Sequence, residues 1–468
     1  MQLTPRDSFL AKTELDASMT RSFIDLFAGC GGLSLGLLES GWDGLAAVER
    51  DNMAFETLQH NLIDGDPSRC RQFNWSLALD KRPITISEFL EELEKSLALQ
   101  KELSNLDLIA GAPPCQGFSF AGRRKANDPR NELFQDYLKV VGQLRPSAVV
   151  LENVKGVTVW HAKSKPYSER IKDGLRDLGY ACYGRIHLAS DFGVPQRRPR
   201  FFLIAVDTQR FNWMDETLLK PHVEAAIEEG NRQLHMKYRL PMGKDTPTGH
   251  AISDLETRGK KKVVSPDDPR KIRKQLAYCE PLEEGLSPYL AAMRRKKPLQ
   301  MDSMRLAKHS DDVKRKFRKL IQHAKKHDRA GVVMHESERA EILQSKKHTV
   351  VVLDRELPSH TLTTLPDDLI HYKEPRILTV REYARLQSFP DWFAFKGKYT
   401  TGGALRKQEC PRYTQIGNAV APMVGEAISI GINLLLDGLE RQQRRLEAIA
   451  TSEGRGKHME AYMEASYG

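Results

Sequence analysis

The stretch FIDLFAGCGG, at residues 23–32, decides the fold. Its first five residues form a short apolar run, which predicts a β-strand over 23–27, and the glycines that follow predict a tight turn before a helix over 33–40. A strand, a glycine-rich turn and a helix together bring backbone N–H groups close to a ligand. The same turn also occurs where a strand and a helix only need to pack closely. These residues alone leave both interpretations open.

The surrounding residues indicate which ligand this turn would hold. A second predicted strand, at 45–48, ends at Glu49, which lies 20 residues beyond Gly29. A carboxylate in that place can accept hydrogen bonds from both hydroxyls of a ribose. A dinucleotide site requires G-x-G-x-x-G, but the third glycine position counted from Gly29 holds Ser34. The pattern therefore disfavours a pyrophosphate ligand and suits a nucleoside without one, such as S-adenosylmethionine.

Strands and helices alternate over the first 206 residues. The predicted strands are at 23–27, 45–48, 106–110, 148–151 and 201–206, and the predicted helices are at 33–40, 52–61 and 132–144. This alternation is typical of an α/β fold with a doubly wound, mostly parallel sheet that helices cover on both faces. Such sheets bind ligands at the carboxyl ends of their strands. We therefore expect the polar motifs that follow these strands to share one site.

The character of the chain changes after residue 206. Residues 256–330 contain 22 Lys and Arg against 10 Asp and Glu, an excess of 12 positive charges in 75 residues. Regular structure returns at Thr379, which forms a predicted capping box with Glu382 at the start of a helix. Pro422 stands at a predicted first position of another helix. We expect one domain over 1–206 plus 376–450, a smaller domain over 207–375, and a polar tail over 451–468 that is frayed from about residue 440.

Composition limits the classes of protein to which the chain can belong. The 468 residues are 40% hydrophobic and contain no run of 18 apolar residues, so they predict no membrane span. The first 21 residues are mixed in charge and lack the apolar segment of a secretory signal. The six cysteines, at 30, 70, 115, 182, 279 and 410, have neither zinc-ligand spacing nor the pattern of a disulfide framework, which indicates a reducing compartment and no metal site. The net charge of +10 permits a polyanionic partner.

The stretch GAPPCQGFSFAGRR, at residues 111–124, carries Cys115 directly after a predicted strand. The two prolines before Cys115 stiffen the turn, so the thiol is presented from a fixed backbone. The Gly-, Ser- and Arg-rich residues that follow suit a mobile loop that closes over an anionic substrate. A lone cysteine is usually an inert buried thiol, but the Pro-Pro-Cys-Gln-Gly-Phe-Ser context at a strand end favours a nucleophile.

Two further stretches carry polar residues next to predicted strands. In LENV, at 151–154, Glu152 ends an apolar strand, where burial would raise its pKa and let it donate a proton. In QRRPRFFLIAV, at 196–206, the guanidinium groups of Arg197, Arg198 and Arg200 suit a carbonyl oxygen or a phosphate. A structural glutamate and a solvated basic strand end are the alternatives, and these residues alone do not exclude them.

Taken in this order, the blocks resemble the DNA (cytosine-5) methyltransferase family, in its bacterial and phage modification type. The resemblance continues at RILTVREYARLQSFPDWF (376–393) and YTQIGNAVAP (413–422), and it covers most of 22–206 and 361–430. It implies a Rossmann-like, S-adenosylmethionine-dependent methyltransferase fold. In that fold the smaller domain, over 207–375, is a target-recognition domain for DNA.

The resemblance also implies roles for individual residues. Cys115 corresponds to the nucleophile that attacks carbon 6 of a flipped-out cytosine, and Glu152 to the residue that contacts ring nitrogen 3. Arg200, supported by Arg198, corresponds to the arginine that holds the carbonyl oxygen of the base. The implied cofactor-binding residues are Phe23 on the adenine, Glu49 on the ribose, and Asp25, Phe27, Ala28, Gly29, Gly31, Gly32, Pro113, Asn418 and Ala419. The implied DNA-binding residues are Gln116, Ser119, Arg123 and Thr361.

The activity that the resemblance implies is transfer of a methyl group from S-adenosylmethionine to carbon 5 of a specific cytosine in double-stranded DNA, by base flipping and a covalent cysteine adduct. One alternative is a tRNA cytosine-5 methyltransferase of the same superfamily, against which the long 207–360 stretch argues. Another is a catalytically inactive DNA-binding paralogue, against which the intact Cys115, Glu152 and Arg200 argue. We expect a cytoplasmic monomer with no membrane partner, and a cognate restriction endonuclease that acts separately.

The sequence departs from the family pattern in the part that would bind adenine. The family usually has an Asp near the third strand that accepts from the adenine amine, and residues 73–79 contain none. Asp80 is the nearest substitute. Arg50 stands where the family often has an aromatic residue after the ribose carboxylate. The residue that contacts the adenine amine is therefore not identified.

Overall fold

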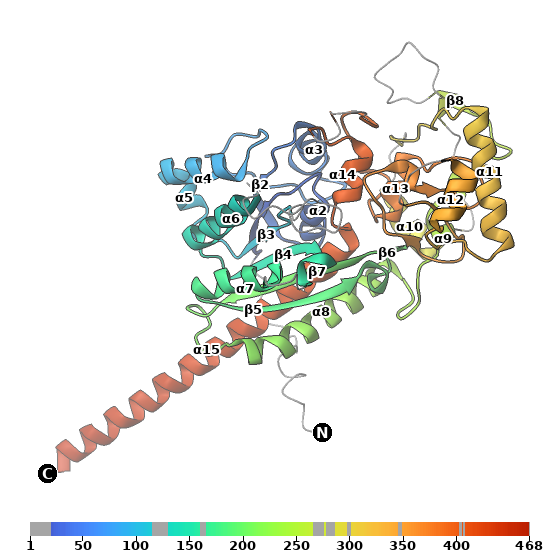
Figure 1. Cartoon of the computed structure of the whole chain (residues 1–468). Coiled ribbons are helices and arrows are strands. Elements are labelled where there is room, and N and C mark those ends of the chain that lie inside the picture. Colours follow the sequence, from blue (N-terminus) through green and yellow to red (C-terminus); the bar gives the residue numbers. More distant parts are fainter. Residues whose placement is uncertain are drawn as a thin grey trace.

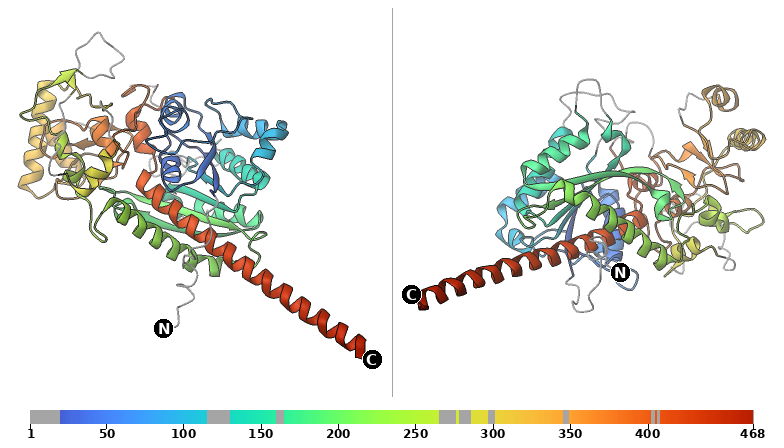
Figure 2. Two further views of the ribbon diagram at one scale, coloured as in Figure 1. Left: turned by 180° about the vertical axis from the view of Figure 1, so that it is seen from behind. Right: turned by 90° about the horizontal axis from the view of Figure 1, so that it is seen from below.

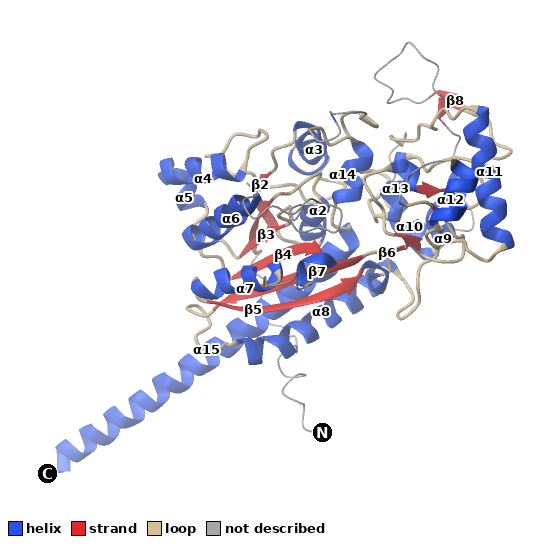
Figure 3. Ribbon diagram, in the orientation of Figure 1, coloured by secondary structure: helices blue, strands red, loops and turns tan. Residues whose placement is uncertain are grey.

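The computed structural model describes residues 20–114, 130–159, 165–264, 276–277, 286–296, 301–344, 349–401, 405 and 408–467. A six-stranded sheet forms its centre, with the strand order β2-β1-β3-β4-β7-β5 (Figures 1 and 3). The strands are β1 (Ser22–Leu26), β2 (Asp43–Val48), β3 (Leu108–Gly111), β4 (Ala148–Val154), β5 (Tyr180–Leu188) and β7 (Pro199–Asp207). Strands β2, β1, β3 and β4 pair in parallel, and β7 runs antiparallel between β4 and β5. The predicted α/β fold with a mostly parallel sheet is confirmed.

The carboxyl ends of β1, β3 and β4 lie together at one edge of the sheet. Leu26 pairs with Gly111, and Gly111 pairs with Leu151. The strand order reverses at β1, which has β2 on one side and β3 on the other. Open α/β sheets bind their ligands outside the strand ends at such a reversal. The glycine turn, Pro113 and Glu152 all follow or end these strands, so the register gathers them at that edge.

Helices cover both faces of the sheet (Figure 2). One face carries α2 (Gly32–Glu39) and α8 (Glu216–Tyr238), which both pack against α15 (Pro422–Tyr467). The other face carries α6 (Arg130–Leu144) and α7 (Tyr167–Asp177), and α4 (Ile86–Lys95) packs on α6. Helices α2 and α15 approach closely at Gly36, where a Cβ would collide with the Glu426 backbone. The C-terminal helix therefore completes the layer that begins at the glycine turn.

Several local predictions can be compared with the structure. Thr379 caps α13 (Val380–Leu386) as predicted, since its hydroxyl accepts from the Glu382 N–H while the Glu382 carboxylate accepts from the Thr379 N–H. Pro422 is the first residue of α15, also as predicted. The expected fraying from about residue 440 is wrong, because α15 continues to Tyr467 (Figure 1). The sequence does not predict β5, because this edge strand is only partly buried and mixes glycine, arginine and histidine with apolar residues.

A second hydrophobic core lies away from the sheet. There α11 (Asp311–Lys326) and α12 (Glu336–Leu343) pack with β10 (Val351–Val352) and β12 (Leu369–Ile370), and we call these four elements the small lobe. By contrast α8, which also lies within 207–375, packs on α15 and β5. The short strands β6 (Gln196–Arg197) and β11 (Ser359–His360) pair in parallel and connect the two parts. The domain boundaries at 206 and 376 stay a prediction.

One helical stretch among the described residues, Arg412–Ile449, is long and apolar enough to cross a membrane. It comprises α14 (Arg412–Asn418) and the first part of α15. In this stretch 78% of the most apolar window is buried inside the protein. That burial is expected for a helix that packs in the core against α2 and α8.

Candidate active site

The glycine turn after β1 holds the carboxylate of Glu49. The Gly29 N–H donates to Glu49 Oε2 over 2.9 Å, and the Asp51 N–H donates to Glu49 Oε1 over 2.7 Å. Burial raises the pKa of Glu49, and the two backbone N–H groups act in the opposite direction. Each carboxylate oxygen can accept a second hydrogen bond. Glu49 can therefore still accept from the hydroxyls of a ribose placed beside the turn.

The turn leaves space beside Gly29. This residue has a φ of 58°, and a Cβ built on it would meet no atom within 4 Å. At Gly31, where φ is 91°, a Cβ would lie 2.8 Å from the Leu62 side chain. At Gly32 a Cβ would collide with the Val420 carbonyl. Two of the glycines are therefore required by packing, whereas the turn is open at Gly29, whose N–H donates to the Glu49 carboxylate.

Phe27, and not Phe23, is the aromatic residue that the structure brings to this turn. Phe27 follows β1 with a φ of 62° and is half-buried. Phe23 is fully buried near the start of β1, where its ring centroid lies 5.3 Å from that of Phe73. A ring enclosed in the core cannot stack on a ligand, so the position of Phe23 does not fit the role expected for it. Ala28 is buried, and its N–H donates to the Val48 carbonyl over 3.0 Å.

Asp25 lies beneath the turn and is 1% exposed. The hydroxyl of Ser34, in the first turn of α2, donates to the Asp25 carboxylate over 2.5 Å. Burial raises the pKa of Asp25 to about 7. Asp25 thus links the end of β1 to the start of α2 and holds the turn in place. A direct contact between Asp25 and the cofactor stays a prediction.

Asn153 connects the ends of β3 and β4. Its side-chain N–H donates to the Pro113 carbonyl over 3.1 Å, and the bond is buried. Pro113 is the second residue before Cys115, so this bond fixes the start of the segment that carries the predicted nucleophile. Cys115 itself and the predicted DNA-binding residues Gln116, Ser119 and Arg123 lie outside the described residues. The sequence analysis does not single out Asn153, although its place directly after Glu152 is a signal for it.

Glu152 and Arg200 form an ion pair at the same edge of the sheet. Arg200 Nε lies 2.9 Å from Glu152 Oε1, and Glu152 is 6% exposed. Burial raises the pKa of Glu152, and the charge of Arg200 opposes that rise. The antiparallel register of β4 and β7, in which Val154 faces Arg200, brings these two side chains to one face of the sheet. The structure thus brings together the two residues for which the family resemblance implies contacts with ring nitrogen 3 and with the carbonyl oxygen.

Arg198 is buried, and its hydrogen bonds to the described residues all go to backbone carbonyls. Its Nη1 donates to Leu362 over 2.9 Å, and its Nη2 donates to Gly417 over 2.6 Å and to Ala419 over 3.4 Å. Burial lowers its pKa from the ordinary value of arginine. These carbonyls flank the predicted DNA contact Thr361 on one side and the predicted cofactor contact Asn418 on the other. Because its Nη groups contact these carbonyls, we expect Arg198 to act as a positioning residue.

Two buried glutamines, which the sequence analysis does not identify, extend this network. The Leu362 N–H donates to Gln196 Oε1 over 2.9 Å, and Gln196 Nε2 donates to the Leu386 carbonyl over 3.1 Å. Gln387 Nε2 donates to the Ala419 carbonyl over 2.5 Å. Both glutamines are 0% exposed. Buried polar side chains with several partners fix the relative positions of the segments that they join.

Asn418 and Ala419 lie at the end of α14 and are held beside the glycine turn. Asn418 is exposed and Ala419 is half-buried. Gln415, one turn earlier, accepts at Oε1 from the Thr57 hydroxyl over 2.7 Å, and its carbonyl is 3.7 Å from the Cys30 sulfur. The two ends of the predicted cofactor site therefore meet, although about 390 residues separate them in the chain. On the DNA side, the hydroxyl of Thr361 donates to the Arg197 carbonyl over 2.8 Å.

The excess positive charge of 256–330 suggests phosphate contacts, and Arg294 and Arg295 are among the basic residues from which we expect them. Arg294 is 8% exposed. Arg295 pairs with Glu39 at 3.1 Å, and its guanidinium lies 4.6 Å from the centroid of the Tyr238 ring. Lys296 donates to the Arg69 carbonyl over 2.7 Å. The expectation of phosphate contacts at Arg294 and Arg295 is therefore wrong, because both side chains pack against the protein.

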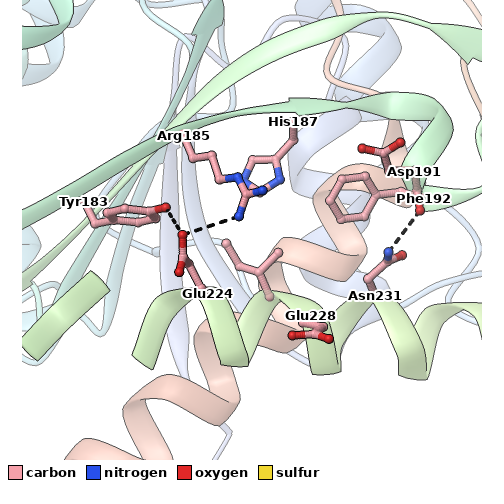
Figure 4. Close-up of a pocket in the computed structure, with 9 residues that line it drawn as sticks. Tyr183, Arg185, His187, Asp191, Phe192, Glu224, Glu228 and Asn231 are labelled. Carbon is pink, nitrogen blue, oxygen red and sulfur yellow. Dashed lines mark hydrogen bonds and ion pairs between the residues drawn. The ribbon is translucent and has the colours of Figure 1, made fainter. Parts of the chain in front are cut away.

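A cavity of about 360 Å³ lies between β5 and α8, and Figure 4 shows its lining. The Tyr183 hydroxyl donates to the Glu224 carboxylate over 2.6 Å there, and Arg185 lies 3.4 Å from the same oxygen. Burial lowers the pKa of His187, in its wall, to about 4. None of the residues that line this cavity is among the predicted site residues. The cavity is therefore separate from the site at the strand ends.

Comparisons with known proteins agree with this geometry. The C-5 cytosine-specific DNA methylase family matches residues 21–433. The Type II methyltransferase M.DdeI of Desulfomicrobium norvegicum is 29% identical over 427 residues, which cover 89% of this chain and 90% of that protein. The Type II methyltransferase M.XorII of Xanthomonas oryzae pv. oryzae is 30% identical over 433 residues, which cover 88% and 84% of the two chains.

A solved structure supports the fold. A prophage-encoded protein of Escherichia coli, assigned as a DNA modification methyltransferase, superimposes with a TM-score of 0.55 at 24% identity, covering 89% of this chain and 99% of that one. The family match spans the glycine turn, Glu152, the 196–200 segment and the segment around Asn418. The resemblance predicted from the motifs is therefore confirmed, and the alternative of a tRNA enzyme is not supported. The chain belongs to the C-5 cytosine-specific DNA methylase family and is a DNA (cytosine-5) methyltransferase.

Proposed function

We propose that this DNA methyltransferase transfers a methyl group from S-adenosylmethionine to carbon 5 of a specific cytosine in double-stranded DNA, with Cys115 as the nucleophile. The observation that carries the proposal is the convergence of the Glu152–Arg200 pair and the Asn153–Pro113 hydrogen bond at one edge of the sheet. This edge is also the one that the Gly29 turn follows. A nucleophile segment, a proton donor and a nucleoside-binding turn are the parts that methylation of a cytosine ring requires.

The residues of the turn support S-adenosylmethionine as the methyl donor. Glu49 would accept from the ribose hydroxyls, and Phe27 would pack on the adenine. The open side of Gly29 admits the ligand, and Asn418 with Ala419 would close the other end. When bound there, S-adenosylmethionine supplies an electrophilic methyl group on a sulfonium. The remaining predicted contacts, from Asp25, Ala28, Gly31, Gly32 and Pro113, would act through the backbone and shape of the pocket.

Carbon 5 of cytosine is a poor nucleophile, and the protein residues would activate it. The Cys115 thiolate adds to carbon 6, while Glu152 donates a hydrogen bond or proton to ring nitrogen 3, so the electrons of the ring double bond become available at carbon 5. Carbon 5 then takes the methyl group. A base removes the carbon 5 proton, and the Cys115–carbon 6 bond breaks to restore the ring. The raised pKa of Glu152 supports its role as the proton donor.

The target base must leave the duplex before this reaction, because carbon 6 is inaccessible inside the base stack. Extrusion costs a few kcal/mol, which contacts with the phosphates offset. For these contacts we propose Thr361, Gln116, Ser119 and Arg123. For target recognition we propose residues 207–375. We further propose a cytoplasmic monomer that modifies DNA independently of a cognate restriction endonuclease.

Methylation of defined DNA tests the proposal most directly. Unmethylated genomic DNA is incubated with the purified chain and S-adenosylmethionine, and modified positions are mapped by sequencing. We expect 5-methylcytosine at one short recognition sequence. Methylation at adenine, at the cytosine amine, or at no position would refute the proposed reaction. Transfer RNA incubated in parallel should stay unmodified.

A further inference from the structure

Helix α11 has two opposite faces. Its apolar side chains Phe317, Leu320, Ile321 and Ala324 are buried in the core of the small lobe. With about 3.6 residues per turn, the other side of the helix holds a cluster of basic residues. This α11 basic face consists of Arg315, Arg318, Lys319, Lys325 and Lys326, all of which are exposed.

Few carboxylates neutralise this face. Asp312, in the first turn, lies 3.7 Å from Arg315 and 3.1 Å from Lys316. Acidic residues at the N-terminal end of a helix also interact favourably with the helix dipole. For the other four members of the α11 basic face, the structure records no ion pair with any residue that it describes. Four of the five charges on this face therefore lack an ion-pair partner among the described residues.

Several other basic residues of the 256–330 region contact the protein. Arg295 pairs with Glu39, as described above. The guanidinium of Arg305 lies 3.7 Å from the centroid of the Tyr399 ring, and Lys296 donates to the Arg69 carbonyl. Arg258, Lys261, Lys262, Lys296 and Lys308 are also exposed, but they lie on other segments of the described chain, whereas the five basic residues of α11 share one helix face.

We propose that the α11 basic face binds the phosphates of duplex DNA outside the sequence that the active site reads. The face extends along about 16 Å of helix, and duplex DNA carries roughly one negative charge per 1.7 Å of its axis. Figure 1 shows α11 at the outer edge of the small lobe, on the side away from the sheet, and the same coloured helix lies at that edge in Figure 2. The contact is therefore with flanking duplex and independent of sequence. This inference rests on DNA as the substrate and adds a surface to the proposed function.

The test measures how DNA binding depends on salt, using the full chain. A triple variant, Arg318→Gln, Lys319→Gln and Lys326→Gln, removes three charges while keeping residues that favour a helix. A fluorescently labelled random-sequence duplex of about 30 base pairs is titrated at several salt concentrations. Each lost phosphate contact should flatten the slope of log affinity against log salt by about 0.9, so we expect a change of about 2 to 3.

A control variant, Arg441→Gln, Arg444→Gln and Arg445→Gln, removes the same formal charge from α15. Circular dichroism and the thermal midpoint check that both proteins fold. We expect the control to keep the wild-type slope. An unchanged slope in the α11 variant, or an equal flattening in both variants, would overturn the inference. Methyl incorporation into genomic DNA by the wild type is measured separately, so failure of the proposed function appears as absent methylation and not as equal slopes.

Discussion

Arg200 Nε lies 2.9 Å from Glu152 Oε1, across the antiparallel pair of β4 and β7. Burial raises the pKa of Glu152, and Arg200 opposes that rise by favouring the carboxylate. In the proposed reaction the guanidinium of Arg200 turns to the carbonyl oxygen of the cytosine. Glu152 then loses its positive partner inside a buried site, which favours its protonated form. Binding of the base would therefore prepare the acid that acts on ring nitrogen 3.

Replacing the groups that act on the ring should remove catalysis and keep the fold. We expect both Cys115→Ser and Glu152→Gln to lose methyl transfer by at least about 100-fold, the usual order for one acid–base group. Neither change removes core volume, so the thermal midpoint should stay close to that of the wild type. Radiolabelled methyl incorporation is the measurement, with the exposed Glu91→Gln as the matched carboxylate control. Wild-type turnover in Cys115→Ser would contradict the assigned nucleophile.

Loss of the Glu49 carboxylate should weaken the cofactor and spare the DNA. Glu49→Ala removes the proposed acceptor for both ribose hydroxyls and the partner of the Gly29 N–H. We expect S-adenosylmethionine affinity to fall by about 10-fold or more, since hydrogen bonds to charged groups contribute about 1.5 to 3 kcal/mol. Calorimetric titration with S-adenosylmethionine measures this, and Glu56→Ala, on the exposed side of α3 (Asn52–Leu58), is the control. Unchanged cofactor affinity would remove Glu49 from the site.

Replacing Arg198 should weaken both the cofactor and DNA. Its guanidinium holds the Leu362 carbonyl, next to the predicted DNA contact, and the Gly417 carbonyl, next to the predicted cofactor contact. We expect Arg198→Met to weaken both S-adenosylmethionine and DNA, and Arg198→Lys to restore part of each affinity. Arg385→Met is the control, since Arg385 is also 0% exposed but pairs with Asp254 and Asp391. The control should lower thermal stability without weakening either ligand in the folded fraction. A loss confined to one ligand in Arg198→Met would contradict the double positioning role.

The buried Asp25 should make the free energy of unfolding depend on pH. Its pKa rises from an ordinary value of 3.8 to about 7 in the fold, so between these values the folded chain holds a proton that the unfolded chain has released. Stability is therefore lost as pH rises from about 4 to 7. Asp25→Asn removes this titration, and its stability relative to the wild type should rise over that interval, by at most about 1.4 kcal/mol per pH unit.

Urea unfolding at pH 5, 6 and 7 measures this difference. The exposed Asp80→Asn serves as the control and should follow the wild type at each pH. A constant difference between Asp25→Asn and the wild type across the three pH values would mean that Asp25 does not titrate in this range.

Fluorine at carbon 5 of the target should trap the covalent intermediate. After methyl transfer the enzyme must remove a proton from carbon 5, and fluorine cannot leave as a cation. DNA with 5-fluorocytosine at the target should therefore form an adduct that survives denaturation, only when S-adenosylmethionine is present. Peptide mapping should locate the bond at Cys115. An adduct at Cys30 would identify Cys30, and not Cys115, as the nucleophile. The absence of any adduct while ordinary DNA is methylated would exclude covalent attack by Cys115.

The sequence alone determined the fold class and most of the residues near the site. Apolar runs that end in glycine, proline or glutamate show where strands stop, and parallel strands gather their carboxyl ends at one edge. The capping box at Thr379 and the first position of α15 were predictable for the same reason, since both depend on residues within one helical turn. The motifs and their order were enough to identify the family, because both can be read from the sequence without knowing which residues meet in space.

Tertiary structure alone decided which of these side chains can reach a ligand. Phe23 and Phe27 lie four residues apart in one motif, but packing against Phe73 encloses the first and leaves the second at the turn. Arg295 belongs to a basic run, yet its guanidinium pairs with Glu39 and packs on the Tyr238 ring. Arg198 finds its partner at Gly417, 219 residues away in the chain. Local pattern carries no information about such partners, because burial and hydrogen bonding between distant segments arise only when the sheet, α14 and α15 come together.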